Sequence, residues 1–74
     1  MSNELLYEVS DGIAVITINR PERKNAINRA VRQALFDVWP RFEADDSAQI
    51  AILTGTGDTF CAGMDLIEAA DTVL

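Results

Sequence analysis

Histidine is absent from the chain, and cysteine occurs once, at Cys61. Without histidine there is no imidazole for a Ser–His–Asp triad or for a histidine-ligated zinc site, and we expect no bound metal. A single cysteine also excludes an intrachain disulfide. Cys61 is a nucleophile in principle, but it follows Phe60 in an apolar setting and has no histidine partner. We therefore interpret it as a small core residue.

Long apolar runs are absent as well. No stretch approaches the roughly 20 apolar residues of a membrane span, and the first four residues, MSNE, lack the basic start and apolar core of a signal peptide. We expect no membrane partner and a cytoplasmic location. With 49% apolar and 24% charged residues the chain has a globular composition. Its 74 residues allow one small domain, residues 1–74, which buries only roughly 60% of its unfolded surface.

Basic residues are scarce: six stand against twelve acidic ones, giving a net charge of −6. This balance argues against nucleic-acid binding. Five of the six basic residues nevertheless fall between positions 20 and 32, where Glu22 is the one acid: Arg20, Arg23, Lys24, Arg29 and Arg32. This cationic cluster has two interpretations. It is either a solvated loop and helix start, or a grip on a phosphorylated ligand, since Lys and Arg pair with phosphate.

The first third of the chain predicts a β-hairpin. Residues 5–10 and 13–19 carry strand signatures, and Asp11-Gly12 between them favours a two-residue type I′ turn. In the second strand both alternating faces are fairly apolar, which is typical of a strand covered on both sides.

A helix is predicted after this hairpin. Arg20-Pro21 ends the second strand, because proline lacks the ladder donor, and residues 21–27 read as an exposed loop. Asn28 is a suitable N-cap. The expected buried face is spaced by three and four residues: Val31, Leu35, Val38 and Phe42. Pro40 falls inside this pattern and removes a hydrogen bond to the carbonyl of Phe36, so we expect a kink or an early end there.

Residues 44–47 read as a loop, residues 50–53 as a buried strand and residues 65–74 as a second helix. Because a helix separates them, the strands at 13–19 and 50–53 are expected to be parallel, joined by a right-handed crossover. The predicted layout is α/β, in the order β-β-α-β-α. A parallel pair needs cover on both faces, and this chain offers one full helix and the start of another. The sequence thus predicts an incomplete unit, a fragment or one piece of an assembly.

The loop after the third predicted strand contains candidate ligand-binding residues. It contains Gly55 and Gly57, and the small residues Ala62 and Gly63 let a ligand approach the main chain. At a helix start, the amides of Gly63 and Met64 would be unpaired donors suited to an anion site or oxyanion hole.

An ordinary strand–turn–helix joint without chemistry is the alternative. A dinucleotide-binding fingerprint is excluded, because its third glycine would fall at Phe60.

Four segments together resemble the N-terminal part of the enoyl-CoA hydratase/isomerase (crotonase) superfamily. They are GIAVITINRP at 12–21, KNAIN at 24–28, LTGTG at 53–57 and FCAGMDL at 60–66. The resemblance covers nearly the whole chain, in the right order and spacing. It implies a spiral of β-β-α units, assembly as trimers or hexamers of the same chain, and an acyl-CoA substrate that brings its own coenzyme A, with no separate cofactor.

Residue by residue, the resemblance implies that the backbone N–H of Met64 is one of two donors to the thioester oxygen. Ala62, Gly63 and Asp65 would shape the pocket for the adenine and pantetheine arm, and Leu66 belongs to the same substrate-binding set. Lys24 and Ala26 match the loop near the nucleotide end of coenzyme A, which gives the cationic cluster a specific role.

The family's second oxyanion amide and its acid/base carboxylates correspond to positions after Leu74. We interpret Glu68 and Asp71 as solvated residues of the last helix, and Pro40 departs from the helix usual in the family. The expected function is therefore a hydratase or isomerase acting on acyl-CoA, with the isolated chain inactive. A non-catalytic CoA-binding or assembly module is the alternative.

Overall fold

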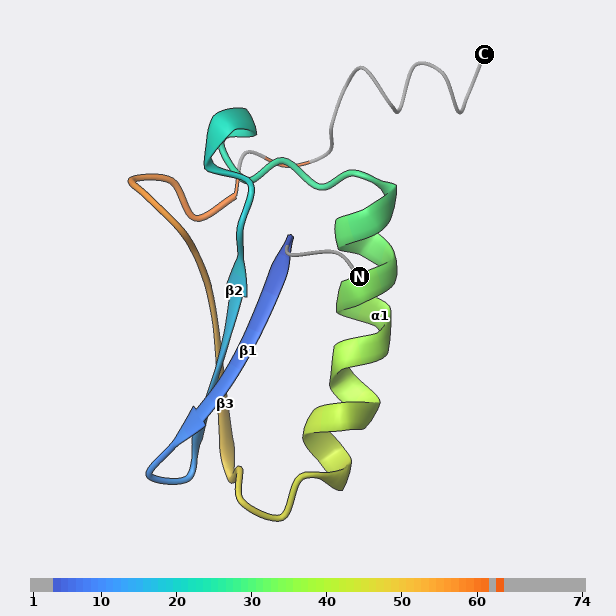
Figure 1. Ribbon diagram of the computed structural model, residues 1–74, viewed down its shortest axis with the longest axis vertical. Helices are drawn as coiled ribbons and strands as arrows, with labels where there is room; N and C mark the ends of the chain where they lie inside the picture. Colours follow the sequence, from blue (N-terminus) through green and yellow to red (C-terminus); the bar gives the residue numbers. More distant parts are fainter. Residues whose placement is uncertain (1–3, 62, 64–74) are drawn as a thin grey trace.

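A computed structural model describes residues 4–61 and 63. Three strands form one sheet in the order β1-β2-β3, and a long helix lies along one face of it (Figure 1). In chain order the elements are β1 (Leu5–Ser10), β2 (Ile13–Ile18), the 3-10 helix η1 (Pro21–Arg23), α1 (Arg29–Ala44) and β3 (Ile50–Gly55). The predicted α/β order is confirmed as far as β3. The predicted helix at 65–74 lies outside the described residues.

The hairpin and the parallel pairing are both as predicted. Asp11 and Gly12 have φ angles of 54° and 80°, the two positive values that a type I′ turn requires. β1 and β2 are antiparallel from this turn onward. β2 and β3 are parallel, with Ile13 opposite Ile50 and Ile18 opposite Gly55. Both strands therefore end at the same edge of the sheet, the upper end in Figure 1.

The core lies between α1 and the central strand. Asn28 begins the helix as predicted, because its side-chain oxygen accepts a hydrogen bond of 2.8 Å from the amide of Val31. Val31 and Val38 then face the sheet. The buried apolar residues are Ala14, Ile16, Ile18, Val31 and Val38, each at most 5% exposed. No helix among the described residues has the length and apolar character to cross a membrane.

Pro40 does not end the helix, so the predicted early end is wrong. α1 continues to Ala44, held at its last turn by contacts with β1. The Tyr7 hydroxyl donates to the Asp45 carboxylate at 2.7 Å, and the Arg41 guanidinium lies 4.2 Å from the centre of the Tyr7 ring. These tertiary contacts offset the backbone hydrogen bond that proline removes.

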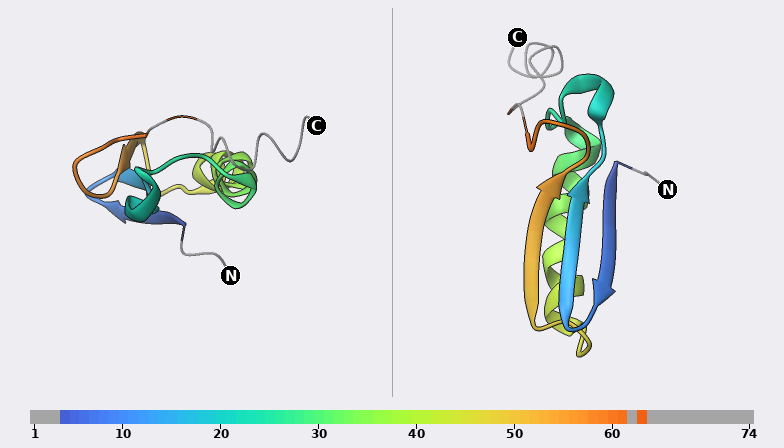
Figure 2. Two further views of the ribbon diagram at one scale, coloured as in Figure 1. Left: turned by 90° about the horizontal axis from the view of Figure 1, so that it is seen from above. Right: turned by 90° about the vertical axis from the view of Figure 1, so that its left-hand side faces the viewer.

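Burial of the strands is lower than predicted. Residues 50–53 were expected to form a buried strand, but β3 is an edge strand in which Ile50 is 59% and Ile52 46% exposed. β2 is covered on the α1 side only; its other face, with Ile13 and Val15, is half-buried. The views from above and from the side place α1 on a single face of the sheet (Figure 2). The expected cover on both faces is therefore wrong for the described residues.

Candidate functional site

Two loops meet where β2 and β3 end. The first, which we call the Lys24 loop, comprises residues 19–28 and joins β2 to α1; the second, the Gly57 loop, comprises residues 56–61. They lie side by side in teal and orange in Figures 1 and 2. In open α/β sheets, ligands bind outside the carboxyl ends of the strands. The first three residues of the cationic cluster, Arg20, Arg23 and Lys24, and the glycine-rich segment of the sequence are thus brought to one edge.

The Lys24 loop turns back on itself through local signals. Pro21 supplies the fixed φ angle that starts η1, and the amide of Lys24 closes that turn on the Pro21 carbonyl at 3.2 Å. Lys24 and Asn25 then adopt left-handed φ angles of 54° and 58°. Asparagine tolerates this region better than most residues, whereas lysine does not. The loop predicted as simply exposed therefore has a defined and partly strained backbone.

Asn25 is fully buried and joins the two loops. Its side-chain nitrogen donates to the carbonyl of Thr56 at 2.8 Å and to that of Thr59 at 2.5 Å. Its side-chain oxygen accepts from the amide of Arg20 at 2.9 Å. A further bond runs from the amide of Ile27 in the Lys24 loop to the carbonyl of Gly63, two residues after the Gly57 loop, at 2.7 Å. Backbone and side chain together hold the loops in register.

Arg20 belongs to this framework and is neither solvated nor available to a ligand, which corrects both interpretations of the cationic cluster at this position. It is 9% exposed. Its guanidinium pairs with Glu4 at 3.2 Å and donates to the carbonyl of Ala26 at 2.7 Å. The positive charge of Arg20, one of those interpreted as a phosphate contact, instead fixes the Lys24 loop to the start of β1.

Lys24 itself is exposed and lines a hollow of about 230 Å³ between the two loops. The lining residues are Pro21, Lys24, Thr56, Gly57, Asp58 and Thr59. The hollow therefore holds one cation, one carboxylate and two hydroxyl-bearing residues. Such a mixture suits a polar ligand. No cluster of acidic or cysteine side chains that could hold a metal occurs among residues 4–61 and 63.

The structure places the other predicted site residues unevenly. Ala26 is half-buried in the Lys24 loop, and its amide donates to the carbonyl of Arg23 at 3.0 Å. Gly63 has a φ angle of 102°, and its amide donates to the sulfur of Cys61 at 3.3 Å. The prediction of an unpaired Gly63 amide is thus wrong. Cys61 is half-buried and not in the core, so that prediction is also corrected.

The remaining predicted positions lie outside the described residues. They are Ala62, Met64, Asp65 and Leu66 of the site, together with Glu68 and Asp71. The proposed oxyanion donor, the amide of Met64, is therefore still a prediction.

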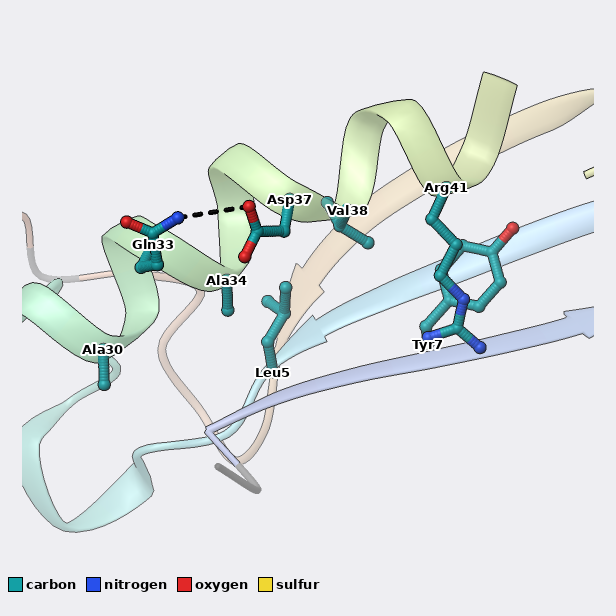
Figure 3. A pocket seen from close by; sticks show the side chains of 8 residues that line it. All are labelled: Leu5, Tyr7, Ala30, Gln33, Ala34, Asp37, Val38 and Arg41. Carbon is teal, nitrogen blue, oxygen red and sulfur yellow. Dashed lines mark hydrogen bonds between the residues drawn. The ribbon is translucent and has the colours of Figure 1, made fainter. Parts of the chain in front are cut away.

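A larger cleft, of about 440 Å³, lies between α1 and β1 and contains none of the predicted site residues. Its floor is apolar, with Leu5, Ala34 and Val38 pointing into it (Figure 3). Along the rim Gln33 donates to Asp37 at 3.1 Å, and Arg41 stacks on the Tyr7 ring. Its polar groups are paired with one another and do not converge on the cavity.

Sequence reasoning missed Asn25 as a residue of the site. A weak signal for Asn25 was present, because asparagine is among the few residues that adopt the left-handed conformation and it stands in a turn that follows proline. Its partners, Thr56 and Thr59, are more than thirty positions away in sequence. No local pattern indicates that pairing.

Comparison with known proteins decides the family. The family model described as enoyl-CoA hydratase/isomerase matches residues 8–73. The chain belongs to the enoyl-CoA hydratase/isomerase family. This confirms the resemblance found in the sequence, and it accounts for both loops, since the match spans them.

Several members of the enoyl-CoA hydratase/isomerase family are similar to the chain. A hydroxycinnamoyl-CoA hydratase-lyase of Pseudomonas fluorescens is 43% identical over 82% of the chain and 22% of its own length. A probable peroxisomal enoyl-CoA hydratase of Arabidopsis thaliana is 47% identical over 81% of the chain and 23% of its own length.

Solved structures of the enoyl-CoA hydratase/isomerase family share the fold. The crystal structure of the enoyl-CoA hydratase EchA1 from Mycobacterium marinum superposes with a TM-score of 0.88 at 50% identity, covering 95% of the chain and 28% of that protein. The chain thus spans about a quarter of the length of the relatives it matches, and it corresponds to their N-terminal portion.

Proposed function

We propose that the chain serves an enoyl-CoA hydratase/isomerase-type reaction on acyl-CoA thioesters. The observation that carries the proposal is the meeting of the Lys24 loop and the Gly57 loop at one sheet edge. There Lys24, exposed beside the hollow, is available to a phosphate of coenzyme A, and the chain leads directly from the Gly57 loop towards position 64. The names of the relatives support a CoA thioester as substrate.

In this proposal the amide of Met64 is one donor to the thioester oxygen. When water adds to an enoyl-CoA, its oxygen bonds to the β-carbon and gives up one proton to a base, and the electron pair of the double bond moves onto the thioester as an enolate. The enolate is then protonated at the α-carbon. A fixed amide donor stabilises that oxyanion, and one such donor is worth about 3 kcal/mol. Ala62, Gly63, Asp65 and Leu66 would line the channel for the pantetheine arm.

Binding is tested by titrating coenzyme A against the chain while following the amide signals of Lys24 and Ala26 in the Lys24 loop, those of Gly57 and Thr59 in the Gly57 loop, and those of residues 62–66. We expect shifts in both loops together. Lys24→Gln should weaken binding about fivefold, the usual effect of removing one partly exposed charge from a phosphate contact. Arg41→Gln, which changes an exposed cation in the last turn of α1 and outside the cationic cluster, is the matched control and should leave the affinity unchanged.

Polarisation of the substrate provides the second test. With an acyl-CoA bound, a donor at position 64 should lower the carbonyl stretching frequency of an isotope-labelled thioester relative to free substrate. An unchanged frequency with saturated binding would favour the alternative, a non-catalytic CoA-binding or assembly module. Absence of binding at every amide named above would leave the assembly role alone.

Location and assembly are part of the proposal. We infer a cytoplasmic protein acting as a trimer or hexamer of identical chains, although one relative is named peroxisomal. The open face of the sheet, described above, supports burial against further protein. Hydration, double-bond migration and other reactions of the family would be distinguished by assaying the products formed from one enoyl-CoA.

A further inference from the structure

The buried side chain of Asn25 uses its hydrogen-bonding groups entirely on the two loops. Both donors of the side-chain nitrogen are taken by carbonyls of the Gly57 loop, those of Thr56 and Thr59. The oxygen accepts from the amide of Arg20 in the Lys24 loop and, at 3.4 Å, from the Thr56 hydroxyl. Among side chains this short, only an amide has two donors and an acceptor. No other residue type would therefore satisfy the partners in both loops.

The junction has no spare room. A Cβ atom at Gly55 would lie 2.6 Å from the side-chain nitrogen of Asn25 and would collide with the carbonyl oxygen of Phe60. A glycine at the end of β3 is therefore needed for the Gly57 loop to close over Asn25. The tight fit means that a displacement of either loop is transmitted to the other.

Lys24 depends on this junction for its position. Its left-handed backbone is unfavourable for a lysine and persists only where the surroundings fix it. The side chain of the neighbouring Asn25 supplies that restraint, because it accepts from the Arg20 amide on one side and donates to the Gly57 loop on the other. Without it, Lys24 would be free to leave the left-handed region and the edge of the hollow.

We propose that Asn25 is a positioning residue that holds the Lys24 loop and the Gly57 loop as one unit, so that both face a single ligand. The identity of that ligand, coenzyme A, rests on the proposed function. Asn25 itself is fully buried and touches no ligand; it acts through Lys24 and through the backbone of residues 56–59.

The main variant is Asn25→Gly in the full chain, because glycine keeps the left-handed backbone and removes only the side-chain bonds. Hydrogen exchange should show the amides of Thr56 and Ile27 losing protection together, by about tenfold or more, while the β1–β2 ladder is unchanged. The dissociation constant for coenzyme A should rise about tenfold. Val38→Ala, a core change on α1 away from both loops, is the control and should lower overall stability without altering that constant.

A second variant guards against a simple folding defect. Asn25→Asp has the same shape and can still accept from the Arg20 amide, but a carboxyl group has at most one proton to donate and cannot satisfy the carbonyls of both Thr56 and Thr59. It should weaken binding of coenzyme A as much as Asn25→Gly does. Retained affinity in either folded variant, or loss of protection in only one loop, would overturn the proposal.

A double-mutant cycle tests whether Asn25 acts through Lys24. Lys24→Gln should weaken binding in the native chain but have little further effect in the Asn25→Gly chain, whereas two independent effects would add. If the native chain fails to bind coenzyme A, the proposed function fails; the exchange experiment still decides whether Asn25 couples the loops.

Discussion

Adjacent residues in the Lys24 loop divide two roles between them. Asn25 is buried and bonded on all sides, and Lys24, with the same left-handed backbone, is exposed beside the hollow. The arrangement couples a rigid support to a charged group that remains available. This division explains how a small chain with a net negative charge can hold a positively charged side chain in a fixed position at the sheet edge.

Asp58 offers a test of the hollow's electrostatics. Its carboxylate lines the same hollow as Lys24 and would oppose an incoming phosphate. Asp58→Asn should therefore tighten binding of coenzyme A two- to fivefold at low salt, roughly the effect of one screened like charge, with the gain shrinking as salt is added. Calorimetric titration at two ionic strengths would measure this. Asp37→Asn, on α1 and outside the hollow, is the control; a gain in both variants would show that only net charge matters.

The contact between Tyr7 and Asp45 predicts the pH dependence of stability. Hydrogen bonds from the Ser47 hydroxyl, from Tyr7 and from the Ser47 amide lower the pKa of Asp45. Partial burial, followed by the bond to Asp45, raises the pKa of Tyr7. Because the pKa of Asp45 is lowered in the folded state, its carboxylate stabilises the fold at pH values above its unfolded pKa of about 4. This stabilisation is lost as pH falls through the folded pKa. Because the pKa of Tyr7 is raised in the folded state, its neutral hydroxyl stabilises the fold at pH values below its unfolded pKa of about 10. This stabilisation is lost as pH rises through the folded pKa.

Denaturant unfolding across pH would check both signs. Asp45→Asn should flatten the loss of stability on the acid side, and Tyr7→Phe should flatten it on the alkaline side. An acid limb as steep in Asp45→Asn as in the native chain would contradict the assignment.

At the scale of the element, α1 carries a proline that its own backbone does not favour. Pro40→Ala restores a hydrogen bond to the carbonyl of Phe36 and removes a steric conflict, so the free energy of unfolding should rise by about 1–3 kcal/mol. Glu43→Ala, an exposed change in the next turn, is the control and should alter it by less than about 0.5 kcal/mol. Thermal or urea unfolding measures both. A loss of stability in Pro40→Ala would mean that the last turn requires the geometry that proline imposes.

Elements set by neighbouring residues were predictable from the sequence, whereas those set by distant contacts were not. The Asp11-Gly12 turn and the Asn28 cap are encoded within a few positions, and both are confirmed. The end of α1 was not predictable, because it is held by a hydrogen bond from Tyr7 in β1, which is distant in sequence. The paired state of Arg20 likewise depends on Glu4, sixteen positions earlier. For the candidate site, pattern matching located both loops but not Asn25, the residue that joins them.

At the scale of the whole molecule, the sheet face opposite α1 is open and carries apolar residues from all three strands. By strand alternation it carries Leu6, Val15, Ile50 and Ile52, of which Ile50 is 59% exposed. Contiguous apolar surface of this kind drives association.

We therefore expect the chain to self-associate, with Ile52→Glu shifting it towards the monomer. Sedimentation velocity at several concentrations would show this. Phe36→Glu, which changes an exposed aromatic on α1, is the matched control. A larger effect from Phe36→Glu would place the association surface on the helix and not on the sheet.

The hairpin at Asp11-Gly12 also fixes an order of events in folding. Its strands are joined by two residues, so β1 and β2 can pair within about 1–10 μs. β3 must wait for more than thirty residues to close, because its partner is β2 and α1 lies between them. During that interval one edge of β2 is paired with β1 and its other edge is still unpaired. The formation of α1 determines how soon β3 of the same molecule pairs with that edge.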